Sequence, residues 1–247
     1  MEIQSVTSAR GWRWIVEGFL LFRMQPLIWI VLLSVMVLIW LGSTLLPPLG
    51  PLAVSLMTPV FVAGLMSACL DTDRGKEPAV RQLFSAFRSH AAPLVTIGGI
   101  YLVGNIVAVA IMLSIAGQDA LQTVLSRTRN EAALAQAMEG LIRGLMIGTL
   151  VFMPVLMAVW FAPLLVIFRN ATPADAMKSS FMACWRNMLP FTVYGMAMLV
   201  LWILATLPLM LGFIVLLPVL MCSIYTSYKD IFGPVEAATA APEPAPE

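Results

Sequence analysis

The chain has 247 residues, of which 60% are hydrophobic and only 11% are charged, and its mean hydropathy is +0.93. Soluble domains are about half apolar and about a quarter charged, so this composition excludes a soluble globular domain and indicates a membrane protein. The formal net charge of +1 provides no basic field of the size that a nucleic acid requires, and we expect no nucleic-acid partner.

Six uninterrupted apolar segments are about as long as the roughly 20 residues that a helix needs to cross a bilayer. None of them contains a charged residue, which costs about 2.5 to 3.5 kcal/mol at the centre of a membrane helix. We therefore predict an all-α polytopic fold with six transmembrane helices, at 27–46, 52–70, 94–116, 145–168, 191–207 and 209–226.

Lys and Arg between the spans predict the orientation, because these residues concentrate on the cytoplasmic side of inner-membrane proteins. With the N-terminus inside, eleven of them lie on the cytoplasmic side and three lie outside, so we expect both termini to be cytoplasmic in a bacterial inner membrane. The eleven are Arg10, Arg13, Arg23, Arg74, Lys76, Arg81, Arg88, Arg169, Lys178, Arg186 and Lys229, and the three are Arg127, Arg129 and Arg143.

A short pattern of an aromatic residue, an arginine and a nearby proline recurs where three of the spans begin. It reads FRMQP at 22–26, FRSHAAP at 87–93 and WRNMLP at 185–190, each after an amphipathic stretch that predicts a helix on the membrane surface. Proline lacks an N–H and fits the first turn of a new helix, so each copy predicts a corner between a surface helix and a span. At these corners we expect lipid-headgroup contacts from Arg23, Arg88 and Arg186.

The first and third surface helices have the clearest apolar faces. In the first, Arg13 and Glu17 are expected to pair, and the residues that face lipid are Trp12, Ile15, Val16, Phe19 and Phe22. In the third, Thr172 is expected to cap the helix, and the buried residues are Met177, Phe181, Trp185 and Met188.

The returning spans share a proline followed by a valine, at Pro59, Pro154 and Pro218. Together with the corners, this predicts three tandem units of interfacial amphipathic helix plus transmembrane hairpin, at about 8–70, 78–168 and 172–232. The units form a single transmembrane domain, 1–232, with a helical periplasmic insertion at 117–140. The Pro-, Ala- and Glu-rich stretch 233–247 predicts a disordered cytoplasmic tail.

Two features within the membrane segments invite a closer interpretation. Gly140, Gly144 and Gly148 recur at every fourth residue, which favours close helix packing inside the chain, with a homo-oligomer interface as the alternative. Asn105 lies within a span, where an amide is expected to bond to a neighbouring helix or, alternatively, to line a pathway.

No arrangement of side chains typical of catalysis occurs in the sequence. The single histidine, His90, falls in the second corner, and Cys69, Cys184 and Cys222 have spacings unlike any metal or redox motif. An enzyme needs a nucleophile, an acid or base, or a metal in one pocket, so we expect no enzymatic activity, no metal and no cofactor.

Three stretches carry a resemblance to known proteins: RGWRWIVEGFLLFRMQPLIWI at 10–30, TPADAMKSSFMACWRNMLPF at 172–191 and SYKDIFG at 227–233. They resemble a family of uncharacterised proteobacterial multi-pass inner-membrane proteins. More distantly, the layout is similar to the membrane domain of some glycerophosphoryl diester phosphodiesterases, whose catalytic domain is absent here. The resemblance implies location and architecture.

We therefore expect a non-enzymatic integral inner-membrane protein that serves membrane organisation, lipid interaction or assembly with a partner. Its expected partners are membrane lipids, with a membrane-protein partner or a homo-oligomer left open. The alternative is a small transporter or lipid-handling protein with a pathway between the repeats. A polar cavity that reaches Asn105 favours transport, whereas an apolar groove at the surface helices favours lipid or partner binding.

Reporter fusions test the orientation. A fusion at Gln122 is expected to report a location outside the cytoplasm, and a fusion after Lys229 a location inside it, because the basic residues concentrate at the cytoplasmic ends. Alkaline phosphatase and green fluorescent protein activities measure the two outcomes, and the reverse pattern would contradict the predicted orientation.

Overall fold

The computed structural model describes residues 2–117, 120–125 and 130–235, and this part of the chain is helical and contains no strand. Six of its helical segments are long and apolar enough to cross a membrane, which confirms the predicted all-α fold with six spans. They are α2 (Pro26–Ser43), α3 (Leu49–Asp73), α5 (Ala91–Ala116), α7 (Glu131–Trp160) with α8 (Ala162–Arg169), α10 (Met188–Thr206) and α11 (Phe213–Phe232).

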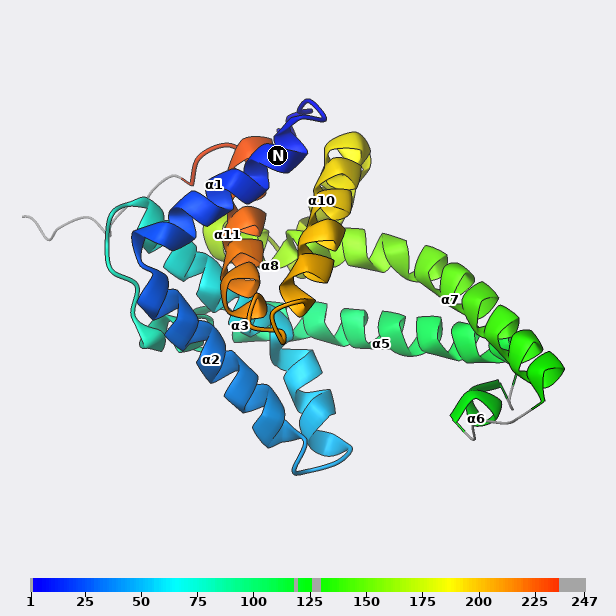
Figure 1. Cartoon of the computed structure of the whole chain (residues 1–247). Coiled ribbons are helices and arrows are strands. Elements are labelled where there is room, and N and C mark those ends of the chain that lie inside the picture. The colour runs from blue at the N-terminus through cyan, green and yellow to red at the C-terminus, as the bar shows by residue number, and fades with distance from the viewer. Residues whose placement is uncertain (1, 118–119, 126–129, 236–247) are drawn as a thin grey trace, which may run out of the picture.

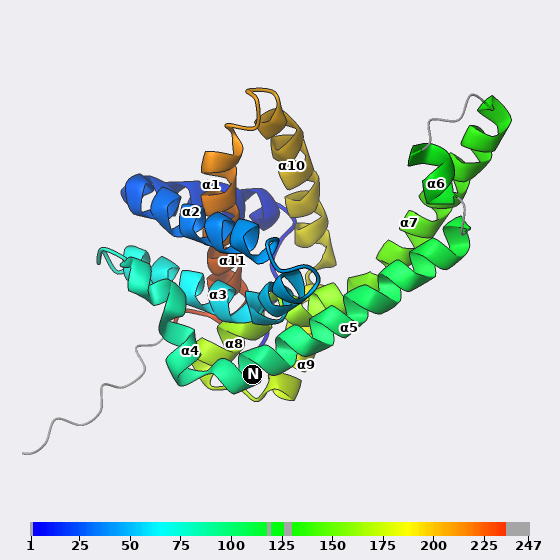
Figure 2. The ribbon, with the colours of Figure 1, turned by 90° about the horizontal axis from the view of Figure 1, so that it is seen from below.

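The spans form three hairpins, α2–α3, α5–α7 and α10–α11, which diverge from a common base (Figures 1 and 2). The base contains α1 (Arg10–Met24), the 3₁₀ turn η1 (Val80–Phe84), α4 (Ser85–Ser89), α8 and α9 (Pro173–Arg186). Both described ends of the chain meet there, because the Gln4 N–H donates to the Ile231 carbonyl at 2.9 Å. Helix α6 (Ala120–Leu125) packs on α7 near the tip of the longest hairpin.

Helices end and begin at all three aromatic–Arg–Pro patterns. Helix α1 ends at Met24 and α2 begins at Pro26, while α9 ends at Arg186 and α10 begins at Met188. At the second corner α4 ends at Ser89, and α5 begins two residues later. Each arginine lies in the last turn of the helix before its corner, where its charge suits the helix C-terminus.

The surface stretch before the second corner is not a single helix. Residues 80–84 form the 3₁₀ turn η1, and the short helix α4 follows it directly. In η1 the Gln82 side chain accepts from the Ala79 N–H at 2.9 Å and also donates to Asp71 at the end of α3. These bonds hold the turn against α3. The spacing of apolar residues, on which the predicted helix was based, gives no sign of them.

Helix α1 packs against protein on a face that was expected to contact lipid. Ile15 and Phe22 are buried, and that part of the prediction is wrong, whereas Trp12, Val16 and Phe19 are exposed. Gly18 explains the close packing, since a Cβ there would lie 2.7 Å from the Ser223 nitrogen of α11. The predicted partner of Glu17 is also wrong, because Glu17 pairs with Arg10 at 3.0 Å.

Helix α9 buries small side chains instead of its large ones. Trp185 and Met188 are exposed and Met177 and Phe181 are only half-buried, so the predicted buried face is wrong. Small side chains allow α9 to approach α7 closely, and the buried ones are Ala176, Ser180, Ala183 and Cys184. The predicted cap is present, since Thr172 Oγ1 accepts from the Asp175 N–H at 3.3 Å.

The fourth predicted span is interrupted at Phe161, between α7 and α8. The Phe161 N–H donates to Ser180 Oγ at 2.9 Å, and Ser180 Oγ donates to the Met157 carbonyl at 2.7 Å. The hydroxyl is thus inserted between two backbone groups that would pair in a continuous helix. Pro163 removes a further N–H from the ladder, so the chain turns here toward the base.

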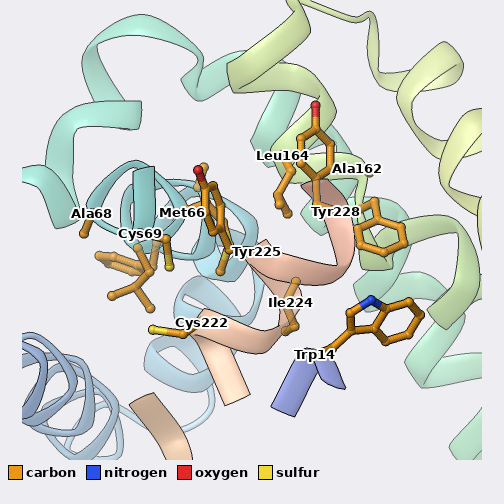
Figure 3. Close-up of a cluster of buried hydrophobic side chains, with 14 of the residues drawn as sticks. Trp14, Met66, Ala68, Cys69, Ala162, Leu164, Cys222, Ile224, Tyr225 and Tyr228 are labelled. Carbon is orange, nitrogen blue, oxygen red and sulfur yellow. The ribbon is translucent and has the colours of Figure 1, made fainter. Parts of the chain in front are cut away.

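The core of the base forms around the end of α11. Figure 3 shows Tyr225 beside Met66 of α3 and Tyr228 beside Leu164 of α8, with the thiols of Cys69 and Cys222 close to one another. These six side chains are almost fully buried. The end of α11 therefore packs against α3 of the first hairpin and against α8, which continues the second.

The glycine stripe is enclosed within the α5–α7 hairpin. A Cβ on Gly140 would lie 2.6 Å from the Ala116 carbonyl oxygen, and one on Gly148 would lie 3.1 Å from that of Ala108. A Cβ on Gly144 would clash with the Met112 carbonyl oxygen. The three glycines let the two backbones touch, and this contact uses the whole stripe inside one chain.

The substitution Gly144→Ala is expected to destabilise the protein by about 1 to 3 kcal/mol, because the methyl group must push α7 away from the α5 backbone. Gly99→Ala is the matched control in the same hairpin, since its Cβ meets only the Leu56 side chain at 3.7 Å. Unfolding in detergent, followed by tryptophan fluorescence, measures both variants. Equal stability of the two would contradict the close packing of the stripe.

Candidate functional site

An apolar groove of about 550 Å³ lies between α7, α10 and α11, beside the end of α9. This volume falls within the range of about 300 to 1,000 Å³ that small-molecule sites usually have. Several of its residues are exposed, including Trp202 and Leu199 of α10, so the groove opens onto the outer surface of the hairpins. The residues that define its length are Met153, Leu156, Trp160, Met198, Leu199 and Trp202.

Aromatic rings form the floor of the groove at its base end. Trp160 contacts Phe191 and Tyr194, with ring centroids 6.1 and 6.3 Å apart. Trp14 of α1 packs behind them, 5.2 Å from Phe191 and 6.0 Å from Tyr194. Tilted and edge-on contacts of this kind are favourable and give the floor a defined shape.

Most polar groups around the groove already have partners within the chain. Thr192 Oγ1 donates to the Met188 carbonyl at 2.8 Å, and the Tyr194 hydroxyl is 2.7 Å from Ser223 Oγ. The indole N–H of Trp160 differs, because it is buried and has no hydrogen-bond partner in the described part of the chain. The groove therefore has an apolar wall with one spare donor near its base end.

Cys184 borders the groove but is not a nucleophile at ordinary pH. Burial raises the pKa of its thiol to about 12, so the reactive thiolate is scarce near neutrality. Its Sγ lies 3.6 Å from the Met157 carbonyl oxygen. Residues 2–117, 120–125 and 130–235 also contain no cluster of His, Cys, Asp or Glu that could hold a metal ion.

Asp230 near the end of α11 fixes the position of the groove floor. Its Oδ2 accepts from Arg10 Nε at 2.6 Å and from Trp14 Nε1 at 2.9 Å. The hydrogen bond to Asp230 is the main reason why the pKa of the Arg10 guanidinium is raised. One carboxylate thus holds both α1 and the tryptophan that packs behind the floor.

Asn187 performs a similar role at the third corner. Its side chain accepts from the Val6 N–H at 2.9 Å and donates to the Gln4 carbonyl at 3.0 Å, which holds the N-terminal segment against the junction of α9 and α10. Asn187 is buried and follows Arg186 directly. Asp73 of α3 connects α3 to α11, because it forms a salt bridge with Lys229 of α11 at 2.6 Å.

Sequence reasoning did not single out Asp230 or Asn187. Both lie in stretches that carried the family resemblance, SYKDIFG and WRNMLP, and each is a polar residue next to apolar ones at a helix end. That signal could have marked them as buried polar groups with long-range partners. It could not have identified those partners, which lie more than 180 residues away in the sequence.

The three corner arginines remain apart. Arg23, Arg88 and Arg186 are exposed at the ends of α1, α4 and α9, and within the described residues none makes an ion pair or a hydrogen bond. Arg186 does not line the groove, but it is the corner arginine nearest to it in the sequence, since Cys184 and Met188, two residues before and after it, are lining residues. His90 at the second corner lies 2.9 Å from Asn170 Oδ1 and 2.8 Å from Ser89 Oγ.

Asn105 lies on the exposed surface of α5 and does not line the groove. Its amide makes no hydrogen bond to another residue that the structure describes, so the expected bond to a neighbouring helix is not formed within this part of the chain. Parts of the predicted periplasmic insertion, residues 118–119 and 126–129, lie outside the described residues, as does most of the predicted disordered tail.

Comparison with known proteins gives one informative relative. The chain is 30% identical over 256 residues to a probable inner membrane protein of Burkholderia thailandensis, and the alignment covers 94% of each chain. No family model matches the chain, and no solved structure matches it. The similarity extends over nearly the whole chain, and an inner membrane protein agrees with the six apolar helices of the structure.

Proposed function

We propose that this chain, which belongs to the same family as that probable inner membrane protein, binds phospholipid in the groove between α7, α10 and α11. The protein is a multi-pass protein of the inner membrane, and the proposal concerns what it does there. The apolar groove, open on the side of the hairpins, is the observation that supports this function. The proposed function is non-enzymatic.

The groove suits an acyl chain in both chemistry and adaptability. Four methionines line it, and methionine fills irregular shapes well because its side chain is unbranched and flexible. They are Met153, Met157, Met188 and Met198. The aromatic floor closes the base end of the groove, so an acyl chain would begin beside Trp160 and Phe191 and run along α7 and α10 away from the base.

Apolar contact by itself does not select a lipid within a membrane, because the surrounding acyl chains are as apolar as the groove. Selection therefore requires polar contacts at the base end. Arg186, which lies two residues from the lining residues Cys184 and Met188 and has no partner among the described residues, would supply a guanidinium for the phosphate, and guanidinium binds phosphate oxygens well through its fork of donors. The Trp160 N–H is a second candidate donor, for an ester carbonyl, and it is buried without a hydrogen-bond partner among the described residues.

The transport alternative receives less support. None of the residues that line the groove is charged, and Asn105, expected to mark a pathway, lies outside it. A lipid-handling role within the same alternative is compatible with the groove.

If both termini are cytoplasmic, as we propose, then the base and Arg186 face the inner leaflet. The similarity to the membrane domain of glycerophosphoryl diester phosphodiesterases remains a prediction.

The substitution Arg186→Gln is expected to reduce labelling by a phospholipid with a photoreactive acyl chain about fivefold, since a basic residue near an anionic surface contributes about 1 kcal/mol. Lys178→Gln is the matched control, because it removes the same charge from the same helix without bordering the groove. Labelling is measured on the purified protein in vesicles of phosphatidylethanolamine and phosphatidylglycerol. Equal labelling of the two variants would contradict a headgroup site at Arg186.

The substitution Gly195→Leu tests the groove itself. Gly195 lines the groove, and a Cβ there meets no atom within 4 Å, so a leucine fills the groove without a clash against the protein. We expect labelling of α7 and α10 peptides to fall at least tenfold while the protein stays folded. Gly42→Leu is the control, since Gly42 has the same free space but lies outside the groove. Unchanged labelling in Gly195→Leu would exclude the groove as the acyl site.

A further inference from the structure

Asn105 differs from three hydroxyl groups of the membrane segments in how its polar atoms are satisfied. Thr58, Ser67 and Thr96 each donate to the carbonyl four residues earlier in their own helix, at 2.9, 3.2 and 3.0 Å. The Asn105 amide makes no hydrogen bond to any residue that the structure describes. Its helix, α5, is one of the six candidate spans, and Asn105 lies near the middle of that helix.

The surroundings of Asn105 are apolar and exposed. Val103, Ile106 and Val109 of the same helix have 61%, 54% and 42% of their surface accessible. In a bilayer these residues face hydrocarbon, where no water is present to pair with an amide. Polar groups in this position are rare, and they usually bond to another helix. A partner for Asn105 must therefore come from outside the described chain.

Helix geometry places a second polar group on the same side of the hairpin. Gly104 of α5 faces Val155 of α7, and Gly148 of α7 faces Ala108 of α5. Asn105 and Thr149 each follow one of these contact glycines by one residue, a rotation of roughly 100°. Because the two helices are antiparallel, these equal rotations point Asn105 and Thr149 to one side. Thr149 is exposed and lies one turn from Met153, where the groove begins.

This face of the hairpin is free for contact with another molecule. The α5–α7 hairpin stands apart from the other two hairpins over most of its length (Figures 1 and 2). Its glycine stripe is already used between α5 and α7, so close packing through those glycines is not available to a further helix. Asn105 and Thr149 place an exposed amide and an exposed hydroxyl on the remaining surface.

We propose that the face of the α5–α7 hairpin that carries Asn105 and Thr149 pairs with the same face of a second copy of this chain. Two copies inserted in the same orientation have Asn105 at the same depth, so a twofold axis along the membrane normal brings the two amides together. An amide is both donor and acceptor, so two asparagines satisfy one another across such an axis. A helix of a different protein would need a polar group that happens to lie at that depth.

Cysteine cross-linking in membranes tests the geometry. The native Cys69, Cys184 and Cys222 are buried, so a mild oxidant acts first on an introduced exposed thiol. We expect Asn105→Cys to form a disulfide-linked dimer. Val103→Cys is the matched control, because it lies one step from Gly104 in the opposite direction and points to the other side of the hairpin. Equal or stronger cross-linking at position 103 would overturn the proposed face.

A measurement of affinity tests the role of the amide. Energy transfer between labelled copies in vesicles, over a range of protein-to-lipid ratios, gives the dissociation constant of the dimer. Asn105→Leu is expected to raise this constant about 3- to 20-fold, as expected for the loss of an interhelical hydrogen bond. Asn105→Gln is expected to retain most of the affinity, and Val103→Leu all of it. A monomeric wild-type protein at every ratio, or an unchanged constant in Asn105→Leu, would overturn the proposal.

Discussion

The carboxylate of Asp230 is the contact on which the arrangement of the base depends. It accepts hydrogen bonds from Arg10 and Trp14, so it attaches α1 to the end of α11. Trp14 in turn packs behind Phe191 and Tyr194, which form the floor of the groove. The three hairpins diverge from the base (Figures 1 and 2), so the spacing between α7 and α10 is set mainly by what is packed there. The ion pair between Arg10 and Asp230, near the end of α11, thus supports a groove formed by residues 153–220.

A groove of this kind has a particular meaning inside a membrane. Apolar surface in contact with lipid is neither favourable nor unfavourable by itself, because hydrocarbon surrounds the protein in any case. What distinguishes the groove is its concave shape and its aromatic floor, with Arg186 close to its base end in the sequence. Phospholipid has the matching parts in the matching order: acyl chain, ester carbonyl and phosphate. The proposed function follows from that order, and it requires no catalytic group.

The sequence was sufficient for the spans and the corners, because both depend on local chemistry. Runs of apolar residues without charge predicted the membrane helices, and the prolines at 26, 93 and 190 fall in the first turn of new helices. The packing of α1 and α9 could not be predicted in the same way. Amphipathic periodicity shows that a face is apolar, but the choice between lipid and protein depends on partners such as Gly18 against Ser223. The groove, Asp230 and the break at Phe161 arise from contacts between distant parts of the chain.

The central claim is that the groove holds phospholipid, and native mass spectrometry of the wild-type protein tests it most directly. The protein would be extracted from its own membrane in a mild detergent and transferred intact, and the mass added to the chain would be measured. The account predicts retention of phospholipid, close to one molecule per chain, which fragments to acyl chains and a phosphate-containing headgroup. A bare chain under conditions that preserve the fold, or a polar solute in place of lipid, would contradict it.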